Sequence, residues 1–444
     1  MATRSDLTTI GLATRLKWQL FRLLERASDL RGNAAAGHLE LSRPPQPLPS
    51  LWVFVSTIGE LNAIDPLLRQ IIARVPRLKL VLITDHPHYR DSYLARYPDA
   101  EICVTLGHGS DAKQLARYFP PRLLVVAEIP CWPSDGPCRF SFAFLLEAKS
   151  AGAVTVLVNA WLYHYKSPSR MDAIERSLFQ TDFLRAFDAI GAQTQETKLH
   201  LLAAGAEESR VSVTGNIKFD AVAQPDWTSA KARSPVLLGA LIDSARPVIV
   251  AGCVTNLAEQ EMVLDAFVSV CGRHPDALLI LAPRHPEVGE RMQVLRNYLE
   301  HRGLTVIFKS TSKVDEPLPA STKCMVLDTM GELRDFYACA TVAHVGVDHN
   351  VLEPLAFGKP VTVLPNWDTT YPSYPVYRLL MDMYTLLEAN CAEDLSTYWL
   401  RMLEQPEHYR ERLAATLDTL SRLRGAVDKH LLQIDALLPS SRPG

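Results

Sequence analysis

Residues 51–75, LWVFVSTIGELNAIDPLLRQIIARV, contain the pattern that decides the fold. The first six residues form an apolar run of the length of a buried strand. A turn containing Gly59 follows, and from residue 61 to residue 75 the apolar residues recur at helical spacing. A buried strand followed by an amphipathic helix is half of a βαβ unit, so the stretch predicts a parallel sheet covered by helices.

The same alternation continues along the chain in two series of apolar runs. The first series comprises residues 51–56, 78–84, 122–128, 153–159 and 188–193. The second comprises residues 247–253, 276–283, 304–308, 324–328, 340–346 and 359–365. A polar, proline-containing stretch separates them, which predicts an N-terminal segment (1–49), a first domain (50–220), a linker (221–246) and a second domain (247–444). We expect an α/β protein with two Rossmann-like, doubly wound domains that face a cleft, with ligands at the carboxyl ends of the strands.

Length and composition agree with two soluble domains. The chain has 444 residues, and a single core stops growing near roughly 250–300 residues. The net charge is 46 − 49 = −3, which argues against a nucleic-acid partner. The eight cysteines include no CxxC pair and lie mostly in apolar surroundings, as buried thiols do in a reducing compartment. These features predict a cytoplasmic protein.

The N-terminal region predicts an amphipathic helix over about residues 11–30. Six apolar residues recur at helical spacing: Leu12, Leu16, Leu20, Leu23, Leu24 and Ala27. Residues 1–49 carry seven Lys/Arg against four Asp/Glu, a local charge of +3. One interpretation is a helix that lies on an anionic membrane with Trp18 at the interface. The other is an ordinary helix packed on the body of the protein. No run approaches the roughly 18–20 apolar residues of a membrane span.

Glu60 is the first candidate catalytic residue. It stands at the start of the predicted helix, directly after a strand and the Gly59 turn, where a ligand could approach the backbone closely. We expect the helix dipole to keep this carboxylate ionised, so that it could accept a proton from a hydroxyl group in the cleft. The alternative is that Glu60 only stabilises the helix start.

Three polar loops follow strands of the second series. Arg284 offers a planar fork of donors suited to phosphate, and the neighbouring His285 could contact a ligand, act as a general acid or be merely solvated. Thr329 is expected to cap a helix whose exposed amides, over residues 329–332, would seat a phosphate. Glu353 is placed to accept the two hydroxyls of a ribose. Together the loops indicate an anionic nucleotide lying across the second domain.

Several motifs are absent. The sequence has no GxGxxG, no GxxxxGK[ST], no Asp-x-Asp and no GxSxG. Dinucleotide binding, ATP hydrolysis, a metal-chelating nucleotide-sugar site and a serine hydrolase therefore lose support. A transferase that stabilises a leaving phosphate with arginine and helix N-termini, without a metal or cofactor, remains.

At these loops the chain resembles the 3-deoxy-D-manno-octulosonic acid (Kdo) transferases of lipopolysaccharide assembly, from about residue 50 to about residue 425. The similar segments are STIGELNA (56–63), VVAEIPCWP (125–133), VLVNAWL (156–162), GNIKFD (215–220), APRHPE (282–287), DTMGEL (328–333) and HNVLEP (349–354). The resemblance implies the GT-B fold, CMP-Kdo as the donor substrate and Glu60 as the general base.

The resemblance also implies two sets of binding residues. The donor set is Pro283, Arg284, His285, Thr329, Met330, Gly331, Glu332, His349, Asn350 and Glu353. The set on the sugar and acceptor side is Ser56, Gly59, Glu128, Asn216 and Lys218.

The chain also departs from the family pattern. Pro130 and Trp161 replace a glutamate and an arginine of the family, and residues 253–255 read Cys-Val-Thr instead of Ser-Thr-His. A glycine-rich insertion is reduced to Gly346-Val347-Asp348, and the basic helix replaces a more hydrophobic anchor. These departures indicate a divergent member or paralogue.

The resemblance predicts an inverting, metal-independent transfer of Kdo from CMP-Kdo to a lipid A precursor. The enzyme would work at the cytoplasmic side of the inner membrane, attached peripherally through residues 11–30. Three alternatives stay open: another glycan or glycolipid acceptor, a non-catalytic paralogue that binds CMP-sugars or partner enzymes, and an epimerase-like GT-B enzyme.

Overall fold

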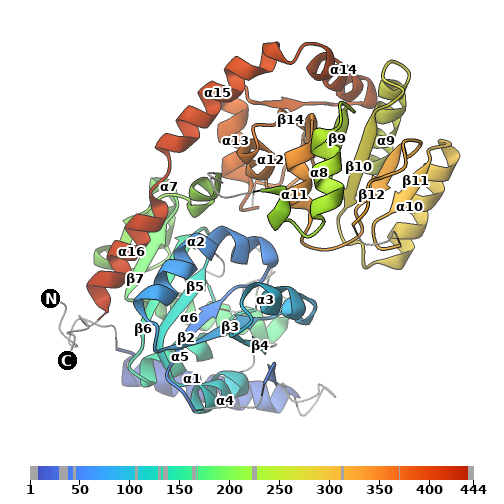
Figure 1. Cartoon of the computed structure of the whole chain (residues 1–444). Helices are drawn as coiled ribbons and strands as arrows, with labels where there is room; N and C mark the ends of the chain where they lie inside the picture. Colours follow the sequence, from blue (N-terminus) through green and yellow to red (C-terminus); the bar gives the residue numbers. More distant parts are fainter. Residues whose placement is uncertain are drawn as a thin grey trace. The chain divides into compact units, whose positions relative to one another are not determined.

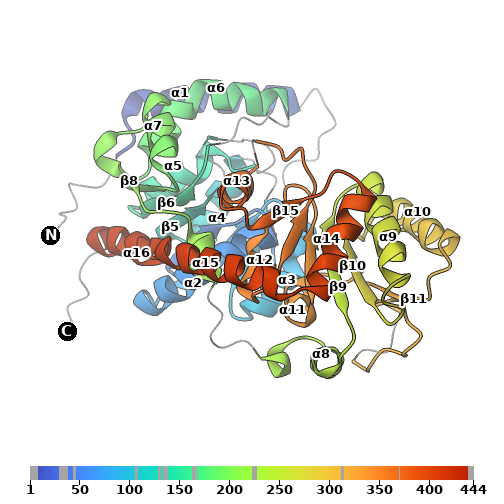
Figure 2. The same cartoon turned by 90° about the horizontal axis from the view of Figure 1, so that it is seen from above.

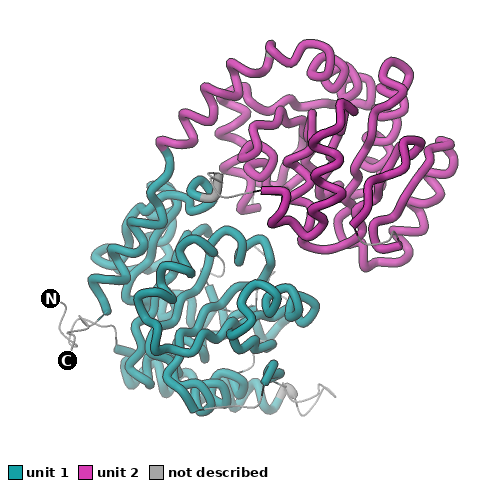
Figure 3. The backbone as a smooth tube through the Cα atoms, viewed as in Figure 1, with its two compact units in different colours: residues 1–220, 423–444 teal, residues 221–422 magenta. Residues whose placement is uncertain are grey.

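The computed structural model describes most of the chain and divides it into two compact units. The described residues are 9–29, 39–43, 47–105, 109–128, 132–133, 139–162, 167, 169–222, 228–311, 315–369 and 371–438. Unit 1 comprises residues 1–220 and 423–444, and unit 2 comprises residues 221–422 (Figure 3). This division differs from the expected one, because the last 22 residues return to unit 1 instead of ending the second domain.

Unit 1 is built on a sheet of eight strands in the order β1-β4-β3-β2-β5-β6-β7-β8 (Figure 1). Their bounds are β1 Glu40–Leu41, β2 Ser50–Phe54, β3 Lys79–Thr84, β4 Glu101–Val104, β5 Pro121–Ala127, β6 Val154–Ala160, β7 Ala189–Ala192 and β8 Val211–Val213. All pairs are parallel except β1 with β4. The sheet grows outward in both directions from β2 and β5, which is the doubly wound arrangement expected from the sequence.

Helices cover both faces of this sheet. Their bounds are α1 Leu12–Asp29, α2 Ile58–Arg74, α3 Arg90–Arg96, α4 Gly109–Tyr118, α5 Phe142–Ser150, α6 Arg170–Arg185, α7 Gln195–Ala203 and α16 Ala426–Leu437. Successive side chains of a strand point to opposite faces. In β2, Trp52 and Phe54 therefore pack in one buried cluster, whereas Leu51 and Val53 pack in the other, with α2 and α16. Burial on both faces explains why the strand reads as a continuous apolar run.

Unit 2 repeats the plan with a seven-stranded parallel sheet in the order β11-β12-β10-β9-β13-β14-β15. Its strands are β9 Val248–Val254, β10 Leu278–Pro283, β11 Val306–Phe308, β12 Cys324–Val326, β13 Val342–Val345, β14 Val361–Val363 and β15 Leu386–Glu388. Its helices are α8 Pro235–Asp243, α9 Leu257–Cys271, α10 Gly289–His301, α11 Leu333–Phe336, α12 Leu352–Ala356, α13 Tyr374–Asp382, α14 Ala392–Glu404 and α15 Glu407–Arg422. Helix α8 lies in the stretch that we expected to be a linker, and Leu237, Leu238 and Leu241 on it are buried.

Helix α1 has two apolar faces. Trp18 and Phe21 are buried against Phe142 and Phe179 of unit 1, so the interpretation that placed Trp18 at a membrane interface is wrong. Thr14 and Lys17 bind the Asp182 carboxylate of α6, beside which α1 lies (Figure 2). The opposite face carries Leu12, Leu16, Leu20, Leu23 and Leu24, which are 58–73% exposed. Within the described residues, no helix is long and apolar enough to cross a membrane.

Asp220 fixes the C-terminal helix to unit 1. Its two carboxylate oxygens accept hydrogen bonds from the backbone N–H groups of Gly425 (2.6 Å) and Val427 (2.8 Å) at the start of α16. Gly425 has a φ of 99°, a conformation that favours glycine. Further along α16, buried His430 accepts a hydrogen bond from the N–H of Asn159 (3.2 Å). The last helix is therefore part of the unit 1 core.

Candidate functional site

The two central strands of unit 1 bring two carboxyl groups to one edge of the sheet. Strands β2 and β5 are adjacent and parallel, and the chain leaves them toward opposite sides of the sheet. Ligands of such sheets bind at the carboxyl ends of the strands at this switch point. Glu60 follows β2 and Glu128 follows β5. The electrostatic effect of Glu128 on Glu60 shows that the two carboxyl groups lie close enough to interact.

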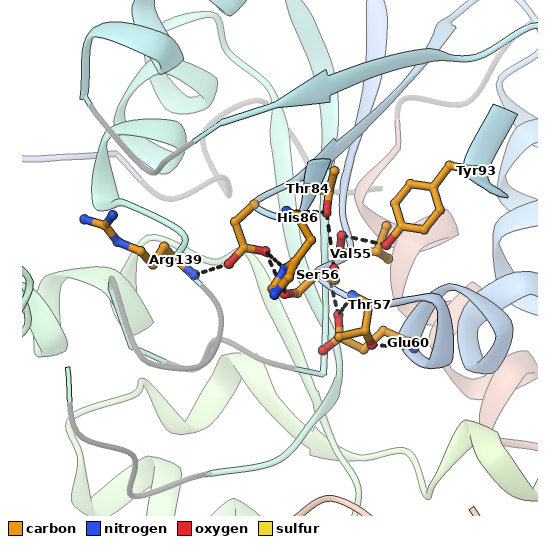
Figure 4. A network of polar contacts seen from close by, with 9 residues as sticks. Val55, Ser56, Thr57, Glu60, Thr84, His86, Tyr93 and Arg139 are labelled. Carbon is orange, nitrogen blue, oxygen red and sulfur yellow. Dashed lines mark hydrogen bonds and ion pairs between the residues drawn. The ribbon is translucent and has the colours of Figure 1, made fainter. Parts of the chain in front are cut away.

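The Glu60 side chain is held in a capping box at the start of α2 (Figure 4). Its Oε2 accepts hydrogen bonds from the backbone N–H groups of Ser56 (2.6 Å) and Thr57 (3.3 Å). In return, the Thr57 hydroxyl accepts one from the N–H of Glu60 (3.2 Å). The residue is only 6% exposed. The Thr-x-x-Glu spacing of residues 57–60 is the sequence signature of this arrangement.

The ionisation of Glu60 differs from the sequence prediction. Burial raises its pKa to about 8, and the charges of Glu128 and Asp85 act in the same direction. The hydrogen bonds from Ser56 and Thr57 lower the pKa but do not offset these effects. Glu60 is therefore mostly a neutral acid at pH 7, not a carboxylate kept ionised by the helix dipole. A carboxyl group with this pKa can both take up and release a proton near neutral pH.

Glu128 belongs to a buried polar network at the ends of β5, β6 and β7. Its Oε1 pairs with the Lys218 ammonium (2.6 Å) and accepts a hydrogen bond from the Gln193 amide (3.2 Å). Gln193 Oε1 accepts from the Asn216 side chain (3.0 Å), and Asn159 Oδ1 accepts from the N–H of Ile217. The structure thus brings together Glu128, Asn216 and Lys218, three of the residues that the resemblance assigned to the sugar and acceptor side.

Two features of this network were missing from the sequence prediction. Asn159 and Gln193 belong to it, and Glu128 and Asn159 both have left-handed φ angles, 52° and 55°. Such backbone strain in non-glycine residues is concentrated at functional sites. Both added residues stand at the ends of predicted strands, and that position is the signal that could have identified them.

Ser56 links Glu60 to an Asp-His pair after β3, which the sequence prediction also missed (Figure 4). Its hydroxyl donates to Asp85 Oδ1 (2.7 Å), and the same oxygen accepts from His86 Nδ1 (2.8 Å). The N–H of Arg139 binds the other oxygen of Asp85 (2.9 Å). The signal here is again position, because Asp85 and His86 directly follow the apolar run 78–84.

The switch point of unit 2 lies between β9 and β13. Cys253, at the end of β9, has a φ of 56°. A Cβ atom at Gly346, just after β13, would lie 2.0 Å from the Cys253 carbonyl oxygen, so only glycine fits there. The departures from the family pattern at 253–255 and 346–348 therefore fall on two backbone segments in direct contact.

Arg284 is a charged residue at this edge. It follows Pro283, the last residue of β10, and its N–H donates to the Val254 carbonyl (3.0 Å). Its charge adds to the effect of burial, which lowers the pKa of His349 to about 3. His349 is therefore neutral, and within the described part of the chain its Nε2 is buried without a hydrogen-bond partner. His285 is more exposed, has a φ of 59° and pairs through Nδ1 with Glu287 (2.9 Å).

The expected helix cap at Thr329 is wrong. Helix α11 starts later, with Glu332 as its N-cap residue, and is only four residues long. The Thr329 hydroxyl donates to the Glu332 carboxylate (3.0 Å), and the Met330 carbonyl accepts from Arg233 (2.8 Å). Gly331 has a φ of 82°, so this segment is a turn, which the Thr329–Glu332 contact and Arg233 stabilise.

The next predicted loop is a helix start. Asn350 Oδ1 accepts a hydrogen bond from the N–H of Leu352 (3.1 Å), the first residue of α12, whose N-cap residue is Val351. Glu353 is the second residue of this five-residue helix. Burial raises the pKa of Glu353, and the charge of Arg334 opposes that effect. Across the described ranges, no group of three or more His, Cys, Asp or Glu side chains is arranged to hold a metal ion.

Comparisons with known proteins identify the relatives of this chain. Residues 25–221 match the protein family described as 3-Deoxy-D-manno-octulosonic-acid transferase (kdotransferase). The 3-deoxy-D-manno-octulosonic acid transferase of Haemophilus influenzae is 27% identical over 397 residues, 87% of this chain and 86% of its own length. The enzyme of the same name from Bordetella pertussis is 28% identical over 374 residues, 79% of this chain and 77% of its own length. The chain is a divergent relative of the Kdo transferases.

This relationship confirms the resemblance seen in the sequence and the enzyme class, a glycosyltransferase. Solved structures confirm the fold. UDP-GlcNAc 2-epimerase from Neisseria meningitidis, bound to UDP-GlcNAc, has a TM-score of 0.57 at 16% identity, covering 87% of this chain and 99% of its own. A glycosyltransferase from Rickettsia africae has a TM-score of 0.55 at 12% identity, covering 89% and 100%. The chain thus has the GT-B fold of two Rossmann-like units.

Of the two single-residue departures from the family pattern, at positions 130 and 161, the structure describes only the second. Pro130 lies outside the described residues. Trp161 lies beside Glu128, because its N–H donates to the Glu128 carbonyl (3.3 Å). The residue that replaces the arginine of the family at position 161 therefore contacts the Glu128 network of this chain.

Proposed function

We propose that this protein transfers Kdo from CMP-Kdo to a hydroxyl group of a lipid A precursor, with inversion at the anomeric carbon and without a metal ion. The relatives are named for the transfer of Kdo, which supports Kdo as the transferred sugar. The observation that carries the chemistry is Glu60, a buried carboxyl group at the switch point of unit 1 whose pKa lies near 8.

In the proposed step, Glu60 in its ionised form takes the proton of the acceptor hydroxyl. The hydroxyl oxygen forms a bond to the anomeric carbon from one face of the sugar while the bond to the CMP phosphate oxygen breaks on the other. The products are the glycosylated acceptor, CMP and the protonated Glu60, which returns its proton to water. The raised pKa makes Glu60 a stronger base than an ordinary carboxylate, at the cost of a smaller ionised fraction at pH 7.

The departing CMP needs positive charge and hydrogen-bond donors. We assign this role to Arg284, whose guanidinium can bind phosphate oxygens through two N–H groups. His349, neutral and with a buried Nε2 that has no partner among the described residues, can exchange a hydrogen bond with the nucleotide without adding charge. Glu353 is assigned to the ribose hydroxyls. The helices α11 and α12 are too short to supply a helix dipole of any size, so the charge on Arg284 carries more of the phosphate stabilisation than the sequence predicted.

Lys218 and Glu128 are assigned to the sugar. Their ion pair is nearly buried, and the Gln193 amide fixes the Glu128 carboxylate further. The negative charge of Glu128 is one of the effects that raise the pKa of Glu60.

The direct test is incubation of the purified protein with an in situ supply of CMP-Kdo and a tetraacyl lipid A precursor, read by mass spectrometry. We expect the acceptor to gain the mass of one or more Kdo residues. If a phosphate-free glycolipid is modified instead, the acceptor assignment fails and the donor assignment stands. CMP binding without transfer to any acceptor would favour a non-catalytic paralogue.

We also propose that the protein attaches peripherally to the cytoplasmic side of the inner membrane through α1. Trp18, Phe21 and Lys17 anchor this helix to unit 1, so its second face is held outward. The exposed leucines of that face follow each other at helical spacing and present a continuous apolar stripe. The local charge of +3 would favour anionic lipids. Such attachment would place the enzyme at the surface that holds a lipid acceptor.

A further inference from the structure

His86 lies beside the proposed base and has no role in the step described above. Its Nδ1 is 2.8 Å from Asp85 Oδ1 and 3.3 Å from the Ser56 hydroxyl, and Ser56 binds Glu60 through its N–H (Figure 4). The His86 side chain is 31% exposed, whereas the Asp85 side chain is 5% exposed. The buried Asp85 carboxylate thus holds a partly exposed imidazole, and Ser56 connects this pair to the Glu60 carboxyl group.

The hydrogen bonds define the proton on Nδ1. A carboxylate oxygen only accepts hydrogen bonds, so Nδ1 must be the donor. The hydrogen bonds of the ring within the described residues involve Nδ1 only, which leaves the second nitrogen, Nε2, without a partner there. In a nucleophilic triad, the serine would contact the nitrogen opposite to the one held by aspartate. Here Ser56 and Asp85 meet the same nitrogen, which argues against a hydrolase.

The charges around His86 favour its cationic form. The Asp85 hydrogen bond raises the pKa of His86, and burial opposes that effect. Arg139 contributes only its backbone N–H to Asp85, because its guanidinium pairs with Asp172 (2.9 Å). The rings of His88 and Tyr89 pack on the His86 ring at 5.4 and 5.7 Å between centroids. Glu60, beyond Ser56, is mostly neutral at pH 7.

We propose that His86, held by Asp85, recognises an anionic oxygen group of the sugar substrate bound at the switch point of unit 1. The group is a phosphate of the acceptor or the carboxylate of the transferred keto-sugar acid, since an imidazolium Nε2–H donates a charge-assisted hydrogen bond to either. This inference rests on the proposed function. It adds a residue that sets specificity and leaves proton transfer to Glu60.

The first test needs no catalysis. In the full-length protein with ¹⁵N-labelled histidine, the His86 signals are assigned from their loss in His86→Gln and followed by NMR against pH. Glucosamine 6-phosphate, Kdo and glucosamine are then added separately. We expect the first or the second, but not glucosamine, to move the His86 signals and raise the measured pKa of His86. The responding compound identifies the anionic group, and the absence of a response to both would overturn the proposal.

The second test is the dependence of transfer on this residue. His86→Gln should raise KM for the anionic substrate roughly tenfold, the value of one hydrogen bond to a charged group, and change kcat little. His86→Lys restores the positive charge and should restore a low KM that no longer rises with pH between 6 and 8. The control is His200→Gln, which removes an exposed imidazole on α7 of the same unit and should leave KM unchanged. Equal effects of His86→Gln and His200→Gln would contradict the proposal.

The two tests separate the proposals. If an anionic sugar moves the His86 signals but no Kdo transfer is detected, the recognition site stands and the proposed function fails. If transfer is detected and His86→Gln behaves like the wild type, the proposed function stands and the recognition role fails.

Discussion

Replacing Glu60 by glutamine tests both the proposed chemistry and the electrostatics of unit 1. Glutamine has nearly the same size and can still accept the hydrogen bond from the Ser56 N–H, but it cannot take up a proton. Transfer should fall roughly 10²–10⁴-fold, the usual contribution of a general base. In the wild type, kcat/KM should rise with pH and level off above about 8, because the base must be ionised. CMP binding should be unchanged, since the proposed nucleotide contacts lie in unit 2.

Stability should change in a pH-dependent way. The pKa of Glu60 rises from 4.5 to about 8 in the folded protein, so the native state binds more protons than the unfolded state between these values. The stability from Glu60 is fully present below pH 4.5 and is lost as the pH rises through about 8. Since each pKa unit corresponds to about 1.4 kcal/mol, the full difference is on the order of a few kcal/mol. Glu60→Gln should therefore be more stable than the wild type at pH 9, and the difference should shrink toward pH 4.5.

Urea unfolding at several pH values and transfer measured by mass spectrometry provide the two readouts. The matched control is Glu207→Gln, which removes an exposed carboxylate of unit 1 that pairs with Arg210. It should lose no activity and show no gain in stability at high pH. A stability difference between Glu60→Gln and the wild type that stays constant with pH would refute the raised pKa. Activity within a few-fold of the wild type would refute the role of Glu60 as the base.

Three further predictions concern other parts of the chain. CMP should raise the Tm more than UMP does, and Arg284→Ala should remove most of that rise; a full rise in the variant would exclude Arg284 from the nucleotide site. The wild type should sediment with anionic vesicles, and added salt should weaken this binding. The double variant Leu16→Glu, Leu20→Glu should no longer sediment, whereas the control Leu199→Glu, at an exposed leucine of α7, should sediment like the wild type. Equal sedimentation of the double variant and the control would contradict attachment through α1. Asp220→Ala should cost about 2–4 kcal/mol of unfolding free energy in urea, because two hydrogen bonds to a charged group are lost; a loss under about 0.5 kcal/mol would contradict the importance of this contact.

The buried central strands could be predicted from the sequence because both of their faces are covered. Strands β1, β4, β8 and β15 were missing from the prediction. In β4 the first residue is Glu101, a buried glutamate whose carboxylate accepts from the Ser42 hydroxyl and the Arg43 N–H. The apolar pattern of a strand cannot show that a buried carboxylate accepts hydrogen bonds from residues almost 60 positions away in the sequence.

The site was predictable in position but not in ionisation. The placement of Glu60 follows from a local pattern of strand, turn and helix. Its pKa depends on Glu128, which follows a different strand, and on the depth of burial, neither of which the local sequence reveals. In the same way, Trp18 could have faced either side of α1, and only the aromatic residues of α5 and α6 decide between them.

The return of the last helix to unit 1 has a consequence for synthesis of the chain. Unit 2 is one continuous stretch, residues 221–422, inserted into a unit 1 whose last piece is made only after unit 2. On the ribosome, unit 2 can complete its core while the first 220 residues still lack α16, the helix whose Val427, Leu431 and Ile434 fill one face of their sheet. The nascent chain therefore exposes part of an apolar sheet face until residues 426–437 have been made, a state prone to aggregation. Truncation shortly before residue 426 should yield a folded unit 2 attached to an insoluble unit 1.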